Sequence, residues 1–212
     1  MAFEAFSVRA AGLGCLRSGR QVFSALNFSV GPGLCELRGR NGAGKSSLLR
    51  MIAGFIAPQS GTLTILRNGA PFDDGEAMLG QYLAYSGHQD ALKPVMTPRE
   101  TLAFSARFHG TIATIDHALD RLGLLRLADT PIQYLSAGQR KRVALARHYA
   151  MQKPLWLMDE PLSALDDDGR ARVTDIVRSH VAQGGTVLAA THELIDAAAS
   201  RIVIGAGGGA LP

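Results

Sequence analysis

Apolar positions along the chain follow two patterns. Short, nearly continuous apolar runs are typical of buried strands, and longer stretches with an apolar residue every three or four positions are typical of helices. The predicted strands are residues 5–8, 25–30, 34–37, 62–66, 83–85, 155–158 and 186–190. The predicted helices are residues 45–54, 136–150 and 168–183, and a helical insert extends from residue 97 to about residue 130. Because strands alternate with helices, we predict an α/β fold whose mainly parallel sheet is covered on both faces and begins with antiparallel strands.

The helical insert begins with a recognisable helix start. Thr97 precedes Pro98, and Glu100 follows three residues after Thr97, which is the pattern of a capping box. Apolar residues at helical spacing are predicted to form the core of the insert, namely Leu102, Phe104, Phe108, Ile115, Leu119, Leu122 and Leu125. No repeat or linker divides the chain, so we predict one domain over residues 1–212, with a helical subdomain at about residues 95–150 and a frayed tail at residues 205–212.

Composition narrows the class of protein without identifying a function. The 212 residues are 47% hydrophobic and 19% charged, as in ordinary globular proteins, and no apolar run approaches the roughly 18 residues of a membrane-spanning helix. The first residues lack the features of a secretory signal, which favours a cytosolic location. Cys15 and Cys35 have the spacing of neither a metal site nor a redox pair and are predicted to be reduced, structural thiols. The net charge of +4 is compatible with nucleic acid, an anionic cofactor or a membrane surface.

A glycine-rich segment precedes the helix predicted at residues 45–54. Residues 39–46 read Gly-Arg-Asn-Gly-Ala-Gly-Lys-Ser, which fits the phosphate-binding pattern G-x-x-x-x-G-K-[ST] between a strand and a helix. The glycines let backbone amides surround a phosphate, the Lys45 ammonium can reach the β- and γ-phosphates, and the Ser46 hydroxyl is a magnesium ligand. The predicted nucleotide-binding residues of this segment are Gly39, Arg40, Asn41, Gly42, Ala43, Gly44, Lys45, Ser46 and Ser47.

Two carboxylates end the apolar run at residues 155–158. Adjacent residues of a strand point in different directions, so Asp159 and Glu160 can have different functions. Asp159 is predicted to hold magnesium through water, and Glu160 is predicted to polarise the water that attacks the γ-phosphate. Taken alone, Asp159 could simply cap the next helix, but together with the glycine-rich segment it favours nucleotide hydrolysis.

A second helix N-terminus carries groups that suit a phosphate. Residues 135–139 read Leu-Ser-Ala-Gly-Gln, one residue from the L-S-G-G-Q signature of ATP-binding cassette (ABC) proteins, which the chain therefore resembles. Ser136, Gly138 and Gln139 are predicted to contact ATP bound by another chain, because the resemblance implies a head-to-tail dimer. Residues 163–166 resemble the D-loop of that family, and His192 resembles its catalytic switch histidine. The fold implied is the P-loop ABC ATPase domain.

The chain departs from the usual ABC pattern at two places. His88 stands where most members have a glutamine that senses metal and water, and Gln89 follows it, so either residue could be the metal ligand. Arg17 stands where most members have an aromatic residue that stacks on adenine; it could stack its guanidinium on the base or be a solvated turn residue. The other histidines are expected to face solvent, namely His109, His117, His148 and His180.

Four segments together resemble the ATPase subunits of bacterial cytochrome c maturation systems. They are G-H-x-x-x-L-K at residues 87–93, R-x-G-R at residues 17–20, the signature segment at residues 135–147 and Thr-His at residues 191–192. The resemblance implies ATP and Mg²⁺ as cofactors and a peripheral position on the cytoplasmic face of the inner membrane. It also implies partnership with a CcmB-like transmembrane subunit and heme-handling maturation proteins. The ATP would drive heme export or the release of a heme-loaded chaperone.

Other functions are less well supported by the sequence. The ATPase of another small-molecule exporter shares most of these motifs. A nucleic-acid-associated ABC protein would carry a long coiled-coil insert or a second cassette, and the basic triplet at residues 140–142 lacks interleaved aromatic residues and is expected to lie on an exposed helix face. A P-loop kinase would leave the signature segment and His192 unexplained. We therefore expect no nucleic-acid partner.

Overall fold

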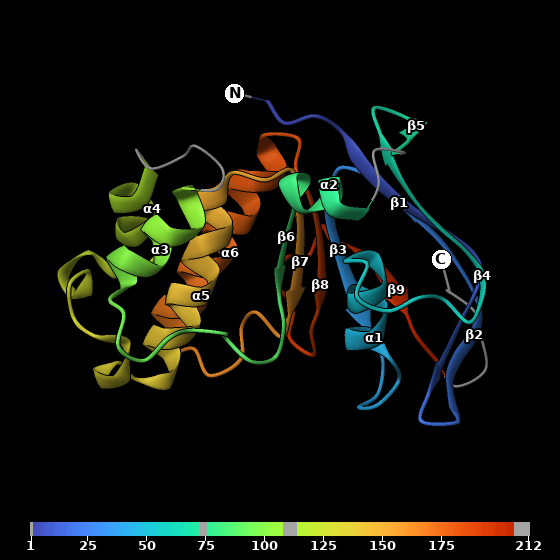
Figure 1. Ribbon diagram of the computed structural model, residues 1–212, viewed down its shortest axis with the longest axis horizontal. Coiled ribbons are helices and arrows are strands. Elements are labelled where there is room, and N and C mark those ends of the chain that lie inside the picture. Colours follow the sequence, from blue (N-terminus) through green and yellow to red (C-terminus); the bar gives the residue numbers. More distant parts are fainter. Residues whose placement is uncertain (1, 73–75, 108–113, 206–212) are drawn as a thin grey trace.

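The computed structural model describes residues 2–72, 76–107 and 114–205, which form two sheets flanked by helices (Figure 1). The antiparallel sheet has the order β2-β1-β4-β5 and contains β1 (Phe6–Arg17), β2 (Arg20–Val30), β4 (Ser60–Arg67) and β5 (Ala70–Pro71). The parallel sheet has the order β6-β7-β8-β3-β9 and contains β3 (Gly33–Arg38), β6 (Leu83–Ser86), β7 (Leu155–Asp159), β8 (Thr186–Ala190) and β9 (Ser200–Val203). This arrangement confirms the predicted mainly parallel sheet with an antiparallel start.

Helices cover both faces of the parallel sheet. They are α1 (Lys45–Ile52), α2 (Glu76–Tyr82), α3 (Pro98–Arg107), α4 (Ile115–Arg121), α5 (Ala137–Met151) and α6 (Asp167–Ala182), with short 3₁₀ turns η2 (Leu125–Leu127) and η3 (Ile132–Tyr134). One apolar core joins α1 to both sheets, and the other joins the helices α3, α4, α5 and α6 to the opposite face of the parallel sheet. In Figure 1, α1 and these four helices lie on opposite sides of that sheet. Among the described residues, no helix is both long enough and apolar enough to cross a bilayer.

Several elements lie beyond the predicted ranges. β1 and β2 form a long hairpin whose two-residue turn has Ser18 and Gly19 at positive φ, a geometry that suits a tight hairpin. The strands predicted at residues 5–8 and 25–30 are only its two outer ends. The prediction also missed α2 and β9. Apart from Gly205, the tail predicted to fray lies outside the described residues.

The predicted core of the helical insert is partly right. Leu102, Leu119 and Leu122 are fully buried, and Thr97 and Glu100 form the expected capping box through two hydrogen bonds of 2.9 and 3.1 Å.

Phe104 and Leu125, by contrast, are exposed, at 56% and 43%. Phe104 lies two residues after buried Leu102 and therefore faces the opposite side of α3. Leu125 begins η2, where the helical period of 3.6 residues no longer applies. Phe108 lies outside the described residues.

Two of the histidines expected to face solvent are buried instead. The His180 ring stacks on the Trp156 ring with 3.8 Å between centroids, and the His148 ring meets the same indole edge-on at 5.7 Å. Burial lowers the pKa of His148 to about 3 and the pKa of His180 to about 4. His117 is exposed as expected, and His109 lies outside the described residues. The stack places two neutral imidazoles between β7, α5 and α6.

This stack predicts that the folded protein loses stability in mild acid. Both histidines stay neutral when folded, but the unfolded chain takes up protons below a pH of about 6.5. The free energy of unfolding should therefore fall by about 2 kcal/mol per histidine between pH 7 and pH 5. Denaturant titrations at both pH values measure this, with His180→Tyr as the test variant and exposed His117→Asn as the control. A pH dependence that is unchanged in His180→Tyr would contradict the assignment.

Candidate nucleotide site

The carboxyl ends of four parallel strands meet at one edge of the sheet, and the loops that follow them carry the predicted site residues. Residues 39–44 follow β3, residues 87–89 follow β6, Glu160 follows β7 and residues 191–192 follow β8. A cavity of about 610 Å³ opens at this edge. The predicted site residues that line it are Arg17, Asn41, Gly42, Gly44, Lys45, Ser46, Ser47, His88, Asp159, Glu160 and His192.

The glycine-rich loop needs glycine where the backbone is left-handed and crowded. Gly44 has φ of +104° at the N-cap of α1, and a Cβ there would lie 2.5 Å from Val22 Cγ1 and 2.7 Å from the Phe23 ring. The Ala43 N–H donates to the Arg40 carbonyl at 3.0 Å and closes the turn within the loop. The loop therefore lies directly against β2 and presents the N-terminus of α1 to the cavity, as phosphate binding requires.

Three ionisable side chains converge at the base of this cavity. Lys45 Nζ donates to the Gly39 carbonyl at 2.9 Å and lies 3.0 Å from His192 Nε2. His192 Nε2 lies 3.6 Å from Glu160 Oε1. Because an ammonium only donates, Nε2 accepts in this contact, which assigns the proton of neutral His192 to Nδ1. The structure thus brings together three predicted site residues that come from three separate segments of the chain.

Glu160 has an uncommon backbone conformation. Its φ is +49°, in the left-handed region that residues other than glycine rarely adopt. The Glu160 N–H donates to the Ala190 carbonyl at 2.8 Å, and Ser163 Oγ donates to the Glu160 carbonyl at 2.9 Å. These two contacts hold the residue where the chain leaves β7, with its side chain in the cavity.

The residues at this site fit a magnesium ion. Asp159 is 3% exposed, and its Oδ2 is buried without a hydrogen-bond partner among the described residues. A buried carboxylate oxygen of this kind needs a partner. Ser46 supplies a second hard oxygen to the same cavity, and Mg²⁺ is commonly held by one or two protein oxygens together with substrate phosphates.

His88 and Gln89 face different spaces. His88 lines the nucleotide cavity, whereas Gln89 lines a separate groove of about 520 Å³ together with Arg50, Tyr85 and Arg147. His88 also borders that second groove. Of the two alternatives left open by the sequence, the geometry favours His88 as the residue that contacts metal or water.

This placement predicts a difference between two alanine variants. His88→Ala should lower ATPase turnover at least tenfold, and His88→Gln should restore much of it, because both side chains can bind metal or water through one atom. Gln89→Ala is the matched control and should stay within about twofold of the wild type. Steady-state phosphate release measures all three. A defect in Gln89→Ala with normal His88→Ala would reverse the assignment.

Arg17 lies at the tip of the β1–β2 hairpin. Its side chain is exposed and lines the nucleotide cavity. The glycine-rich loop lies against the same hairpin, since a Cβ at Gly44 would lie 2.5 Å from Val22 Cγ1. This position allows the guanidinium to stack on a base. The hairpin, which the sequence analysis missed, is what brings Arg17 there.

The signature residues do not reach the cavity of their own chain. Ser136 Oγ accepts from the Gln139 N–H at 3.2 Å, and the Gln139 side chain accepts from the Ser136 N–H at 2.8 Å, so the two residues cap α5. A Cβ at Gly138 would lie 2.8 Å from the Ala164 carbonyl oxygen. The segment at residues 163–166 therefore packs directly against this helix N-terminus. The Ser136 hydroxyl keeps its proton to donate to another molecule.

The basic triplet does not form an exposed face, which corrects the sequence interpretation. Lys141 is buried, and its Nζ lies 3.4 Å from the Asp159 carbonyl oxygen and 3.8 Å from Asp90 Oδ1. Burial lowers the pKa of Lys141, and the nearby carboxylates oppose that shift. Arg142 donates to the Leu122 carbonyl at 3.0 Å. The spacing of Lys141 from buried Leu145, one helical turn, was the signal that could have shown its burial.

Comparisons with known proteins found a matching family model and curated relatives that cover most of the chain. The family model described as "ABC transporter" matches residues 23–163. A protein of Rhodopseudomonas palustris (strain BisB5) named "Cytochrome c biogenesis ATP-binding export protein CcmA" is 44% identical over 199 residues, covering 92% of this chain and 96% of that protein. The protein of the same name from Cupriavidus necator is 43% identical over 193 residues, covering 89% of this chain and 84% of that one.

Solved structures share the fold. A structure titled "Structure of ATP binding subunit of ABC transporter" superposes with a TM-score of 0.83 at 24% identity, covering 96% of this chain and 90% of that chain. A bacterial Atm1-family ABC exporter solved with ATP bound superposes with a TM-score of 0.84 at 25% identity. The superposition covers all of this chain and 39% of the exporter.

Proposed function

The chain belongs to the ABC transporter family, and from that premise we propose that it binds and hydrolyses ATP to drive a membrane complex in c-type cytochrome biogenesis. The relatives named CcmA support this function, since they match this chain over nearly its whole length. We infer that the complex lies at the inner membrane, with this chain on its cytoplasmic face. Residues 1–212 would act as one nucleotide-binding domain, with the helical subdomain at about residues 95–150. The observation that carries the proposal is the convergence of Lys45, Asp159, Glu160 and His192 on one cavity.

The charged and polar groups at the phosphate end of the cavity have separate parts in the proposed hydrolysis. The amides of residues 42–46 and the Lys45 ammonium hold the β- and γ-phosphates. Asp159 and Ser46 would hold Mg²⁺, which supplies positive charge to the phosphate oxygens. Glu160 accepts the proton of the attacking water, and His192 orients the γ-phosphate and the water.

A second copy or a related ABC domain completes the site in this proposal. One chain presents the capped N-terminus of α5, with the Ser136 hydroxyl and the Gly138 backbone, away from its own cavity. A helix N-terminus attracts a phosphate, so head-to-tail packing would bring this segment to the ATP of the partner. Hydrolysis would then require both chains.

We propose that the groove beside Gln89 receives a CcmB-like transmembrane subunit, which works with heme-handling maturation proteins. Arg50 and Arg147 line this groove, and the exposed ring of Phe55 meets the Tyr85 ring edge-on at its border, 5.4 Å between centroids. A helical segment with apolar and acidic side chains would suit such a surface. His88 borders both the groove and the nucleotide cavity, so it could connect partner binding to hydrolysis.

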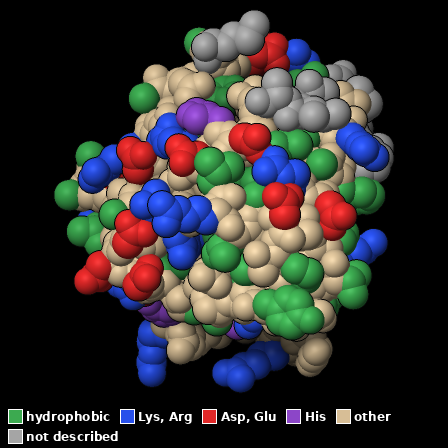
Figure 2. Space-filling view, turned by 90° about the vertical axis from the view of Figure 1, so that its left-hand side faces the viewer, with side chains coloured by type: hydrophobic (Ala, Val, Ile, Leu, Met, Phe, Trp, Pro, Cys, Tyr) green, Lys and Arg blue, Asp and Glu red, His purple; other side chains and the backbone are tan. Residues whose placement is uncertain are grey.

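The alternative of another small-molecule exporter would use the same site and differ only in its membrane subunit. A nucleic-acid function is less well supported. On the face shown in Figure 2, acidic and basic side chains are intermixed. The chain also carries ion pairs of Arg99 with Asp116 and Asp129 and of Arg121 with Asp175. Nucleic-acid binding commonly uses a continuous basic surface.

Phosphate release from ATP by the purified chain tests this function. ATP turnover should be measurable with Mg²⁺. Chelation of the metal should abolish this turnover, and added Mg²⁺ should restore it. Co-expression with its membrane subunit should yield a complex that co-purifies in detergent. Absence of Mg²⁺-dependent hydrolysis, in both the isolated chain and that complex, would contradict the proposal.

A further inference from the structure

A fully buried carboxylate holds the loop that carries His192. Glu36 lies in the middle of β3, and its side chain is 0% exposed. Its Oε1 accepts from the Ile195 N–H at 2.8 Å, and its Oε2 accepts from Arg38 at 2.7 and 3.2 Å. Since a buried charge is costly unless its partners are close, these contacts fix the loop relative to the strand that leads into the glycine-rich segment.

Arg38 extends this contact to the residue after His192. Its Nη2 donates to the Glu193 carbonyl at 2.8 Å. The Thr191 hydroxyl donates to the same carbonyl at 2.9 Å, and the Glu193 N–H donates back to that hydroxyl at 3.0 Å. The backbone on both sides of His192 is therefore fixed, while the His192 ring itself remains half-exposed toward Lys45 and the cavity.

A second arginine connects this loop to the segment at residues 163–166. The Arg170 guanidinium pairs with both carboxylate oxygens of Glu193, a bidentate geometry that restricts both side chains. Its Nε donates to the Leu165 carbonyl at 3.1 Å. Since Ala164 packs on Gly138, a displacement of this segment would act on Arg170 and through it on Glu193.

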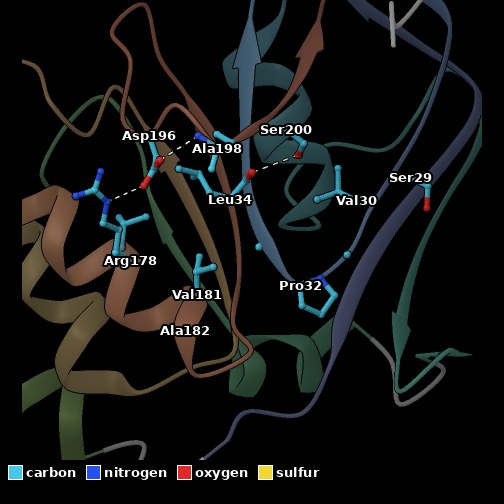
Figure 3. A pocket seen from close by; sticks show the side chains of 14 residues that line it. Ser29, Val30, Pro32, Leu34, Arg178, Val181, Ala182, Asp196, Ala198 and Ser200 are labelled. Carbon is cyan, nitrogen blue, oxygen red and sulfur yellow. Dashed lines mark hydrogen bonds and ion pairs between the residues drawn. The ribbon is translucent and has the colours of Figure 1, made fainter.

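The far half of the same loop is anchored separately. Asp196 accepts from Arg178 at 2.6 Å and from the Ala198 N–H at 3.0 Å, and Ser200 Oγ donates to the Leu34 carbonyl at 3.2 Å (Figure 3). These contacts border a groove between α6 and the start of β3. The contacts of Glu36 and Arg38 thus lie closer to His192 along the chain than the contacts of Asp196 do.

We propose that Glu36, acting through Arg38, and Arg170, acting through Glu193, are positioning residues that hold His192 for ATP hydrolysis. This inference rests on the proposed function. The two arms meet at Glu193, one at its backbone carbonyl and one at its carboxylate. The Arg170 arm transmits the position of residues 163–166, so that packing of a second chain against that segment would align His192 with the γ-phosphate.

Variants of the Arg170–Glu193 pair test the proposal without removing the buried Glu36 carboxylate. Arg170→Met and Glu193→Gln should each lower kcat about tenfold and leave KM for ATP within twofold, because the position of His192 matters in the transition state and not for ATP binding. Arg170→Lys should recover only part of kcat, since an ammonium lacks the bidentate geometry. Glu36→Gln should show the same separation of kcat from KM if the variant folds.

Arg172→Met is the matched control. Arg172 lies on the same helix, and its ion pair with Asp168 is also short, at 2.7 Å, but it does not contact the loop of His192. Its kcat should stay within twofold of the wild type. An equal loss in Arg172→Met and Arg170→Met would assign the effect to α6 in general and overturn the proposal.

A double-mutant cycle with His192→Ala separates positioning from simple structural support. In single-turnover assays, Arg170→Met should cause about a tenfold loss in the wild-type background and less than a twofold further loss in the His192→Ala background. Equal losses in both backgrounds would overturn the proposal. If the wild-type chain hydrolyses ATP but kcat is unaffected in every variant of Arg170 and Glu193, the positioning role fails and the proposed function stands. If the wild type and its complex do not hydrolyse ATP, the proposed function itself fails.

Discussion

Replacing Glu160 by glutamine should stop ATP hydrolysis and leave a dimer with ATP bound. The glutamine side chain keeps the shape of the glutamate but cannot accept the proton of the attacking water, and loss of a general base lowers the rate on the order of 10²–10⁴-fold. The Glu160 backbone is held by contacts to Ala190 and Ser163, so the substitution should leave the fold unchanged. Phosphate release measures the loss of turnover, and light scattering after size exclusion measures the dimer.

The dimer should depend on the signature helix. Ser136→Ala in the Glu160→Gln background should remove the ATP-dependent dimer, because in the proposed dimer the Ser136 hydroxyl at the capped end of α5 would donate to the partner's phosphate. Asp175→Asn, which alters the ion pair between Asp175 on α6 and Arg121 on α4, is the control and should leave the dimer intact. A monomer at saturating ATP in Glu160→Gln, with the membrane subunit present as well as absent, would contradict head-to-tail closure.

Replacing Lys45 by alanine should remove most ATP binding as well as hydrolysis. Lys45 begins α1 directly after the glycine-rich loop, with its Nζ 2.9 Å from the Gly39 carbonyl and 3.0 Å from His192 Nε2. Loss of a direct phosphate contact should lower kcat/KM on the order of 10²-fold or more. Equilibrium binding of a fluorescent ATP analogue and phosphate release measure the two losses.

Lys93→Ala is the control for that experiment. Lys93 is an exposed lysine over the Phe104 ring, 5.8 Å from its centroid, so its loss removes the same charge elsewhere on the chain. Binding and turnover in this variant should match the wild type. Turnover in Lys45→Ala equal to that of the wild type would remove the assignment of the glycine-rich loop as the phosphate site.

The parts of the candidate site that the sequence could indicate are those with a local pattern. Each of two patterns can be recognised within a few residues. One is the glycine-rich loop between a strand and a helix, and the other is the pair of carboxylates at the end of a buried strand. Parallel strands place their carboxyl ends at one edge, which is why residues 39–46, Asp159, Glu160 and His192 could be expected to meet. The cavity brings these same segments together.

The parts that sequence did not predict depend on contacts between distant segments. His148 and His180 are polar, so their burial follows only from packing against Trp156 of β7. Glu36 reads as a polar residue in a strand, and its function is visible only when Arg38 and the loop after β8 are seen around it. Local periodicity contains no information on such partners.

Holo-cytochrome c formation in cells lacking the chain tests the central claim most directly. Deletion should abolish c-type cytochromes, seen as the loss of covalently bound heme after denaturing electrophoresis, and should leave b-type cytochromes at normal levels, because only covalent attachment depends on this route. The wild-type gene should restore the c-type signal, whereas Glu160→Gln, expressed at the same level, should not. Normal c-type cytochromes in the deletion strain, or full rescue by Glu160→Gln, would contradict ATP-driven c-type cytochrome biogenesis by this chain.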